Sequence, residues 1–146
     1  MIEKVFTAKS YPIYSSATSL YKLVAILLIL KKMNKVTIGK LQVYLWGLEN
    51  EVNLNQLKRW KVEKRITDAP WLTEEDFMPI VSQCISNHFV KVETNKSQKT
   101  SLLLDLGAET FLRQISDLEL TAELNASLEE IGKITDTLLD NIEFDF

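Results

Sequence analysis

The sequence predicts a mainly α-helical fold with a small β-hairpin. Two strongly apolar segments at helical spacing follow each other closely between residues 17 and 49. A later segment, 88–106, has apolar runs on both sides of a polar tip, which is typical of a hairpin. Residues 124–142 place apolar side chains in alternating steps of four and three, which indicates an amphipathic helix.

Length and composition suit one globular domain. The chain has 146 residues, of which 46% are hydrophobic and 25% are charged. The longest apolar run, Leu23 to Leu30, is far shorter than the roughly 20 residues that cross a membrane. No secretory signal is recognisable, and the single cysteine, Cys84, cannot form an internal disulfide. We therefore expect a cytoplasmic protein with no membrane contact and a buried Cys84, with a reactive thiol as the alternative.

Charge is divided unevenly along the chain, whose net charge is −3. Residues 1–66 hold 12 Lys and Arg against 4 Asp and Glu, a balance of +8. Residues 67–146 hold 5 against 16, a balance of −11. This division predicts two faces that meet differently charged surroundings. The alternative is that each half simply has a solvated charged exterior.

Segment 17–33 predicts a helix that is buried on almost all sides. Residues 1–16 before it are expected to form an irregular arm, because proline and serine disfavour a helix there. Ser16 is a suitable N-cap, since its hydroxyl can accept a hydrogen bond from a free backbone N–H. A helix that is apolar nearly all round needs neighbours on several sides.

A second apolar helix is predicted over about 38–49. A short polar turn at 34–35 separates it from the first helix, and Thr37 is its expected N-cap. Gly39 and Gly47 each cost up to about 1 kcal/mol within a helix. Their missing side chains permit a close crossing with a neighbouring helix, which offsets that cost.

The middle of the chain predicts two further helices and the hairpin. A basic helix covers about 54–64. Pro79 favours the first position of the next helix, because proline cannot donate a hydrogen bond in a helix interior. The hairpin follows directly, with its polar tip at 95–99, and another helix begins after Gly107.

The last segment predicts an amphipathic helix with an acidic outer face. Its heptad-like stripe is interrupted only by Thr135. The stripe can lie in a groove of a partner protein, and the alternative is that it folds back on its own domain. We divide the chain into a winged-helix-like domain with its N-terminal arm, 1–116, and a C-terminal helix with an acidic tail, 117–146. The expected partner-binding positions are Leu124, Leu128, Ile131, Leu138 and Ile142.

These elements follow the order of a winged helix-turn-helix domain, in which a helix pair supports a third helix and a hairpin forms the wing. Two helices suit the third position, namely the basic one near Lys58 and the one from Pro79 to Asn87. We prefer the helix at Pro79, because the wing normally follows the third helix directly, and the basic helix is then an insertion. The basic helix and the wing tip carry the expected contacts to a partner or to nucleic acid. These are Lys58, Arg59, Trp60, Lys61, Lys64, Arg65, Lys96 and Lys99.

Sequence-specific DNA reading is disfavoured. Lysine and arginine neutralise phosphates, and Trp60 is able to stack on a base. The expected groove helix, PIVSQCISN, nevertheless has no lysine or arginine, and only Gln83 and Asn87 can address base edges.

Few residues suit catalysis. His88 is the only histidine, and beside Phe89 we expect it to be structural. No cluster has metal-ligand spacing, and no phosphate-binding loop or serine nucleophile elbow occurs. Acidic residues at 74–76 suit a first helical turn better than a cation site. We therefore expect no enzyme activity, no metal and no cofactor.

The paired helices resemble a known family. A buried helix of the type YKLVAILLILKKM, a short turn and a capped helix of the type VTIGKLQVYLWGLEN resemble the small middle components of ABC-three-component systems, among them Lamassu-type bacterial defence complexes. The resemblance covers mainly Tyr14 to Asn50, and the later hairpin and helix agree in order. It implies an accessory subunit that joins a large ATPase, similar to structural-maintenance-of-chromosomes (SMC) proteins, to an effector such as a nuclease. The family has no active site to carry over, so no catalytic residue is transferred.

Composition and resemblance together predict a non-enzymatic adaptor in bacterial anti-phage or anti-plasmid defence. Apolar helix faces would supply affinity, and oppositely charged halves would set orientation. Its partners would be the SMC-like ATPase and the effector, with DNA reached through the complex. The alternative is a winged-helix DNA-binding transcriptional regulator.

Overall fold

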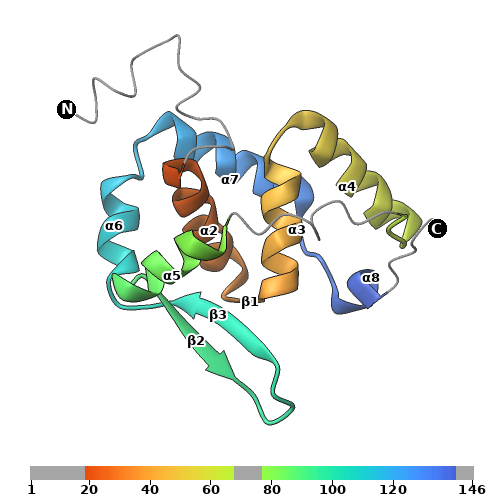
Figure 1. The fold of residues 1–146 in the computed structure, drawn as a ribbon. Coiled ribbons are helices and arrows are strands. Elements are labelled where there is room, and N and C mark those ends of the chain that lie inside the picture. The colour runs from red at the N-terminus through yellow and green to blue at the C-terminus, as the bar shows by residue number, and fades with distance from the viewer. Residues whose placement is uncertain (1–18, 68–76, 141–146) are drawn as a thin grey trace.

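The computed structural model describes residues 19–67 and 77–140, which are mainly helical and include a small three-stranded antiparallel sheet (Figure 1). None of the helices in these two ranges is long and apolar enough to cross a membrane. The helices are α2 (Ser19–Met33), α3 (Ile38–Leu48), α4 (Glu51–Glu63), α5 (Met78–Ser86), α6 (Ala108–Gln114), α7 (Glu119–Ile131) and α8 (Asp136–Asp140). The strands are β1 (Lys35–Thr37), β2 (Val90–Thr94) and β3 (Thr100–Leu104).

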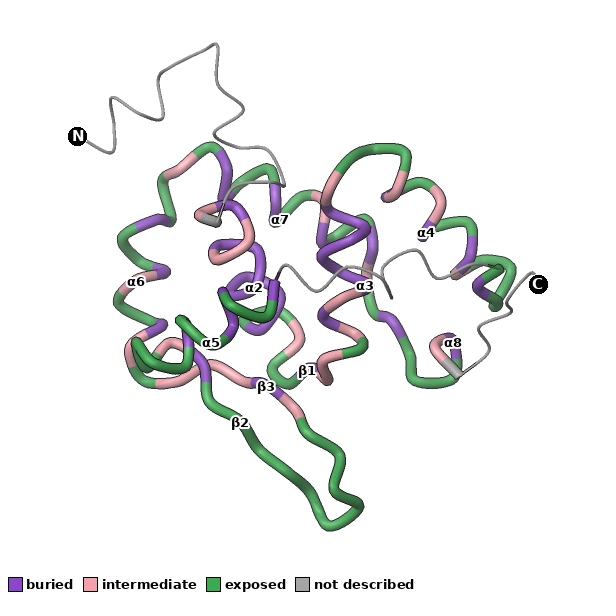
Figure 2. The backbone as a smooth tube through the Cα atoms, viewed as in Figure 1, coloured by how far each residue is buried: buried purple, intermediate pink, exposed green. Residues whose placement is uncertain are grey.

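Helix α2 is enclosed by the rest of the fold. Residues 24–30 are consecutive, and each is at most 3% exposed. Consecutive helical side chains point in all directions around the axis, so their joint burial requires neighbours on every side. Helices α3, α5 and α7 and the sheet supply those neighbours (Figures 1 and 2). The predicted burial is confirmed, whereas the predicted cap, Ser16, lies outside the described residues.

Helix α3 begins and packs largely as its sequence predicts. The side-chain oxygen of Thr37 accepts a hydrogen bond from the Lys40 amide at 3.3 Å, which is an N-cap. At Gly47, an added Cβ would lie 2.7 Å from a methyl carbon of Leu57 on α4. This glycine therefore permits the close crossing of α3 and α4. Gly39 has no such neighbour within 4 Å, so the prediction holds only for the second glycine.

The sheet contains one strand more than the predicted hairpin. Its order is β1-β3-β2, and both pairings are antiparallel. We expected a turn where β1 runs, but Val36 is buried opposite Leu102 of β3. The turn is confined to Asn34, which has a φ of 68°. A strand of three residues is too short to show a recognisable alternation of apolar and polar side chains in the sequence. Its pairing with β3 joins distant parts of the chain, so local sequence does not predict it.

The remaining boundaries are close to those expected. Helix α5 begins beside Pro79, the hairpin is formed by β2 and β3, and α6 follows it. Helix α4 starts earlier than predicted, because the side chain of Asn50 accepts a hydrogen bond from the Asn53 amide and caps it. With α4 set aside, the element order is α2-β1-α3-α5-β2-β3, and the hairpin directly follows α5 as predicted.

The C-terminal segment forms two helices and folds back on its own domain. Helix α7 packs against α2, α3 and α4, and the chain breaks at Gly132, whose φ is 67°. The expectation of one continuous helix was wrong, because this left-handed glycine ends α7 and α8 starts afresh. Ile142 lies outside the described residues. The other four positions expected to bind a partner are buried in the shared core, namely Leu124, Leu128, Ile131 and Leu138.

Replacing Leu128 with alanine should destabilise the isolated chain by about 3 kcal/mol, because it removes a fully buried side chain and leaves a cavity. Urea-induced unfolding monitored by circular dichroism measures the change. Val62→Ala is the control, since Val62 is 83% exposed on α4 and should be nearly neutral. Equal stability of Leu128→Ala and the unaltered chain would contradict a shared core.

Candidate functional site

The aromatic residue of the basic segment is part of the core. Trp60 is 3% exposed and stacks on Trp46, with ring centroids 5.4 Å apart and planes at 19°. Its indole N–H donates to the hydroxyl of Thr67 at 3.2 Å. The expectation that Trp60 stacks on a base or a partner was wrong, because α4 turns this side of its surface toward α3.

Two lysines of the same segment hold α4 against α7. The Lys61 ammonium donates to the carbonyl of Ile131, the last residue of α7, where a cation complements the helix dipole. Partial burial there lowers the pKa of Lys61. The Lys58 ammonium lies 3.9 Å from a carboxylate oxygen of Glu130 on α7.

The other basic residues of the segment lie on the surface. Arg59, Lys64 and Arg65 are exposed, and Lys64 ends α4 with a φ of 61°. The sequence predicted a basic helix, and the fold divides its charges between a contact with α7 and an exposed edge.

The wing lysines differ in their surroundings. The tip is a defined turn in which the side chain of Asn95 accepts hydrogen bonds from the amides of Ser97 and Lys99, both at 2.9 Å. Lys96 is exposed. The Lys99 ammonium lies 3.7 Å from Asp136 in the first turn of α8, so the wing is linked to the C-terminal segment.

A tyrosine that the sequence did not single out fixes the link between α7 and α8. The Tyr44 hydroxyl donates to the carbonyl of Gly132 at 2.9 Å and accepts from the amide of Ile134 at 3.1 Å. Its burial raises the pKa of the phenol. In the sequence, the Tyr44 hydroxyl is a polar group on an otherwise apolar helical stripe. That pattern indicates a polar contact but does not identify its partner.

Helix α5, in the place of the third helix, has no charged side chain. Ile80, Val81 and Cys84 are buried, whereas Met78 and Ile85 are 39% and 38% exposed. Residues seven apart lie on the same side of a helix. The exposed side of α5 is therefore uncharged and partly apolar.

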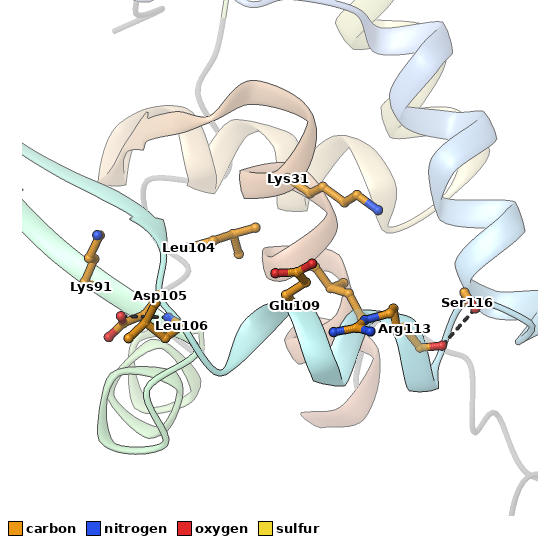
Figure 3. Close-up of a pocket in the computed structure, with 9 residues that line it drawn as sticks. Lys31, Lys91, Leu104, Asp105, Leu106, Glu109, Arg113 and Ser116 are labelled. Carbon is orange, nitrogen blue, oxygen red and sulfur yellow. Dashed lines mark hydrogen bonds between the residues drawn. The ribbon is translucent and has the colours of Figure 1, made fainter.

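A groove of about 560 Å³ lies between the end of α2, the base of the wing and α6 (Figure 3). Lys31, Lys91 and Arg113 contribute positive charge to its walls, and Asp105 and Glu109 contribute negative charge. At its edge Leu106 is 92% exposed. This mixture of both charges with apolar side chains suits a polypeptide better than a simple anion. No sequence pattern indicates the groove, because its residues come from separate segments.

Two residues considered for chemistry, His88 and Cys84, lie within the described ranges, whereas the acidic residues 74–76 lie outside them. His88 is exposed in the turn before β2, and its carbonyl accepts a hydrogen bond from the Gly107 amide at 2.8 Å. Within residues 19–67 and 77–140, no group of His, Cys, Asp and Glu side chains could hold a metal ion. Cys84 is buried as predicted, and burial raises the pKa of its thiol to about 11.

Comparison with known proteins found no matching family model, curated protein or solved structure.

Tyr44→Phe should lower the free energy of unfolding by about 1–3 kcal/mol, because one buried and one partly buried backbone group lose their partner. Urea unfolding measures the loss, and an unchanged dependence on denaturant would show that the folded state remains equally compact. Amide exchange should become faster at Ile134. A variant with unaltered stability would contradict the role of the hydroxyl in fixing the link.

Cys84 should react with a thiol reagent about a hundredfold more slowly in the folded chain than in the unfolded chain. A rise in pKa from 9.0 to about 11 reduces the thiolate population by that factor at neutral pH, and burial slows access further. Labelling with 5,5′-dithiobis(2-nitrobenzoate), with and without guanidinium, measures both rates. Rapid labelling of the folded chain would instead indicate the reactive thiol.

Proposed function

We propose that this chain is a non-enzymatic adaptor subunit of winged helix-turn-helix type. It would join an SMC-like ATPase to an effector, such as a nuclease, in cytoplasmic anti-phage or anti-plasmid defence. The uncharged, partly apolar surface of α5 is the observation that carries the adaptor role. The identity of the partners rests on the resemblance of the first two helices to the middle components of ABC-three-component systems.

The surface of α5 favours a protein partner over a DNA groove. The cores of protein interfaces are depleted of charged residues and enriched in methionine and aromatic residues. A helix that reads DNA usually offers arginine, lysine, asparagine or glutamine to base edges. Met78 is one of the enriched residue types and Ile85 is uncharged and apolar, whereas only Gln83 on α5 meets the second description.

The groove beside α6 supports the same proposal, because it would give an adaptor a second docking region. The exposed Leu106 can provide apolar contact, while Lys31 and Glu109 on facing walls can pair with either charge of a peptide (Figure 3). Two docking regions on different elements are what a subunit that joins two partners requires.

A winged-helix transcriptional regulator is the second candidate. The element order and the exposed Lys96 of the wing favour it. The absence of lysine and arginine from α5 disfavours it, since such a helix gives few contacts in the major groove. A regulator should bind one duplex sequence far more tightly than others.

The adaptor role is tested by co-expressing the tagged chain with the products of its neighbouring genes and measuring the ratio of co-purified subunits. Met78→Glu combined with Ile85→Glu should weaken that association at least about tenfold, because it places charge in an apolar contact. The altered side chains are partly exposed, so the variant should still fold.

Val62→Glu is the matched control, because it also places a carboxylate on an exposed apolar helical position, but on α4. It should co-purify as the unaltered chain does. The proposal is contradicted if the chain purifies alone from such cells, or if the α5 variant retains its partners. Loss of the co-purified partners with Val62→Glu, but not with the α5 variant, would place the docking surface on α4 instead.

A further inference from the structure

A small pocket of about 250 Å³ lies where the end of α2, strand β1, the start of α3 and the α7–α8 link meet. Half of its described lining residues are lysines, namely Lys32, Lys35, Lys40 and Lys133. The other described lining residues are uncharged, namely Met33, Val36, Tyr44 and Ile134. We call this feature the four-lysine pocket.

Three of these lysines pair with carboxylates that stand outside the described lining. Lys32 pairs with Glu129, Lys35 lies 2.9 Å from Glu93, and Lys40 lies 2.9 Å from Asp136. The three carboxylate side chains are 52–74% exposed. Exposed ion pairs contribute only about 0–1 kcal/mol each, so an incoming anion can replace these carboxylates at small cost.

Lys133 differs from the other three lysines. Among the described carboxylates, none forms an ion pair with it, and its side chain is exposed beside the pocket. Its ammonium is therefore available to an external anion.

The start of α3 adds positive potential at the same place. Thr37 caps this helix and Lys40 lies in its first turn, so the positive end of the helix dipole is next to the lysines. Gly39 is exposed in the same turn and has no neighbour within 4 Å of where a Cβ would stand. The first turn of α3 is thus accessible from outside.

We propose that the four-lysine pocket binds a phosphate group of a double-stranded DNA backbone without reading the base sequence. Lysine ammonium groups act as point charges that neutralise phosphates. Apart from its lysines, the described lining offers no free polar side chain for a base edge, since the Tyr44 hydroxyl is engaged by Gly132 and Ile134. The volume is below the roughly 300–1,000 Å³ of small-molecule sites, so it suits a phosphate group better than a whole nucleotide.

The surroundings favour a long polyanion over an isolated phosphate. Asp136 is shared between Lys40 of the pocket and Lys99 of the wing, at 2.9 and 3.7 Å. Lys99 of the wing therefore lies close to the pocket, and Lys96 is exposed at the wing tip. This location differs from the basic helix that the sequence suggested, whose Lys58 and Lys61 face α7.

Fluorescence anisotropy of a labelled duplex of arbitrary sequence, measured over a series of salt concentrations, tests the proposal with the full chain. Lys35→Gln combined with Lys133→Gln should weaken binding at low salt at least about tenfold. The slope of log affinity against log salt should fall by about two, roughly one for each phosphate contact removed. Thermal unfolding checks that the variant is folded.

Two further variants separate the pocket from the total charge. Lys31→Gln combined with Lys91→Gln removes the same charge from the groove beside α6 and should bind as the unaltered chain does. Glu93→Gln combined with Glu129→Gln removes two competing carboxylates and should tighten binding.

The proposal is overturned if the unaltered chain does not bind the duplex at low salt, or if both lysine double variants lose affinity equally. Displacement of the duplex by low concentrations of ATP or inorganic phosphate would assign the pocket to a free phosphate ligand and would also overturn it. The adaptor role rests on α5 and does not depend on the pocket. The Lys35→Gln and Lys133→Gln double variant should therefore still co-purify with its partners. The two proposals can thus fail separately.

Discussion

The enclosure of α2 is the constraint on which the rest of this structure depends. Seven consecutive side chains of this helix, 24–30, have no contact with solvent or almost none. Because they point around the whole helix axis, no single packing partner can cover them. The fold must surround the helix, and it does so with α3, α5, α7 and the small sheet (Figure 2). Among the described residues, the surfaces proposed for binding lie on this surrounding layer and at the end of α2.

This requirement explains why the C-terminal stripe is turned inward. Leu124 and Leu128 cover part of α2 and α3, and an apolar stripe used in that way is not free for a partner. The polar contacts around the same helix follow from its position. Lys61 and Tyr44 bind backbone groups at the end of α7 and in the link after it, where the break at Gly132 leaves those groups without helical partners. Interaction surfaces then remain on the outer sides of α5, α6 and the wing.

The uneven charge of the chain is partly met within the fold. Lys32, Lys40 and Lys58 from the basic half pair with Glu129, Asp136 and Glu130 from the acidic half. Each exposed pair contributes little to stability, yet together they bring α7 and α8 over the basic residues of α2, α3 and α4. The two halves thus meet along α7 and α8. The same arrangement gathers four lysines around one pocket and leaves Lys133 without a carboxylate among the described residues.

The sequence by itself determined the helices, the hairpin and the burial of α2, because these depend on local signals. Thr37 and Pro79 mark helix starts through hydrogen bonding and backbone geometry, and the apolar run after Tyr21 implies burial whatever surrounds it. Only the tertiary structure decided the third strand, since three residues acquire a β conformation here by pairing with a strand more than sixty positions away. It also decided which basic residues are exposed, because that depends on how α4 is rotated against α3 and α7. The four-lysine pocket is of the same kind: its charges lie far apart along the chain, and only packing around α2 brings them together.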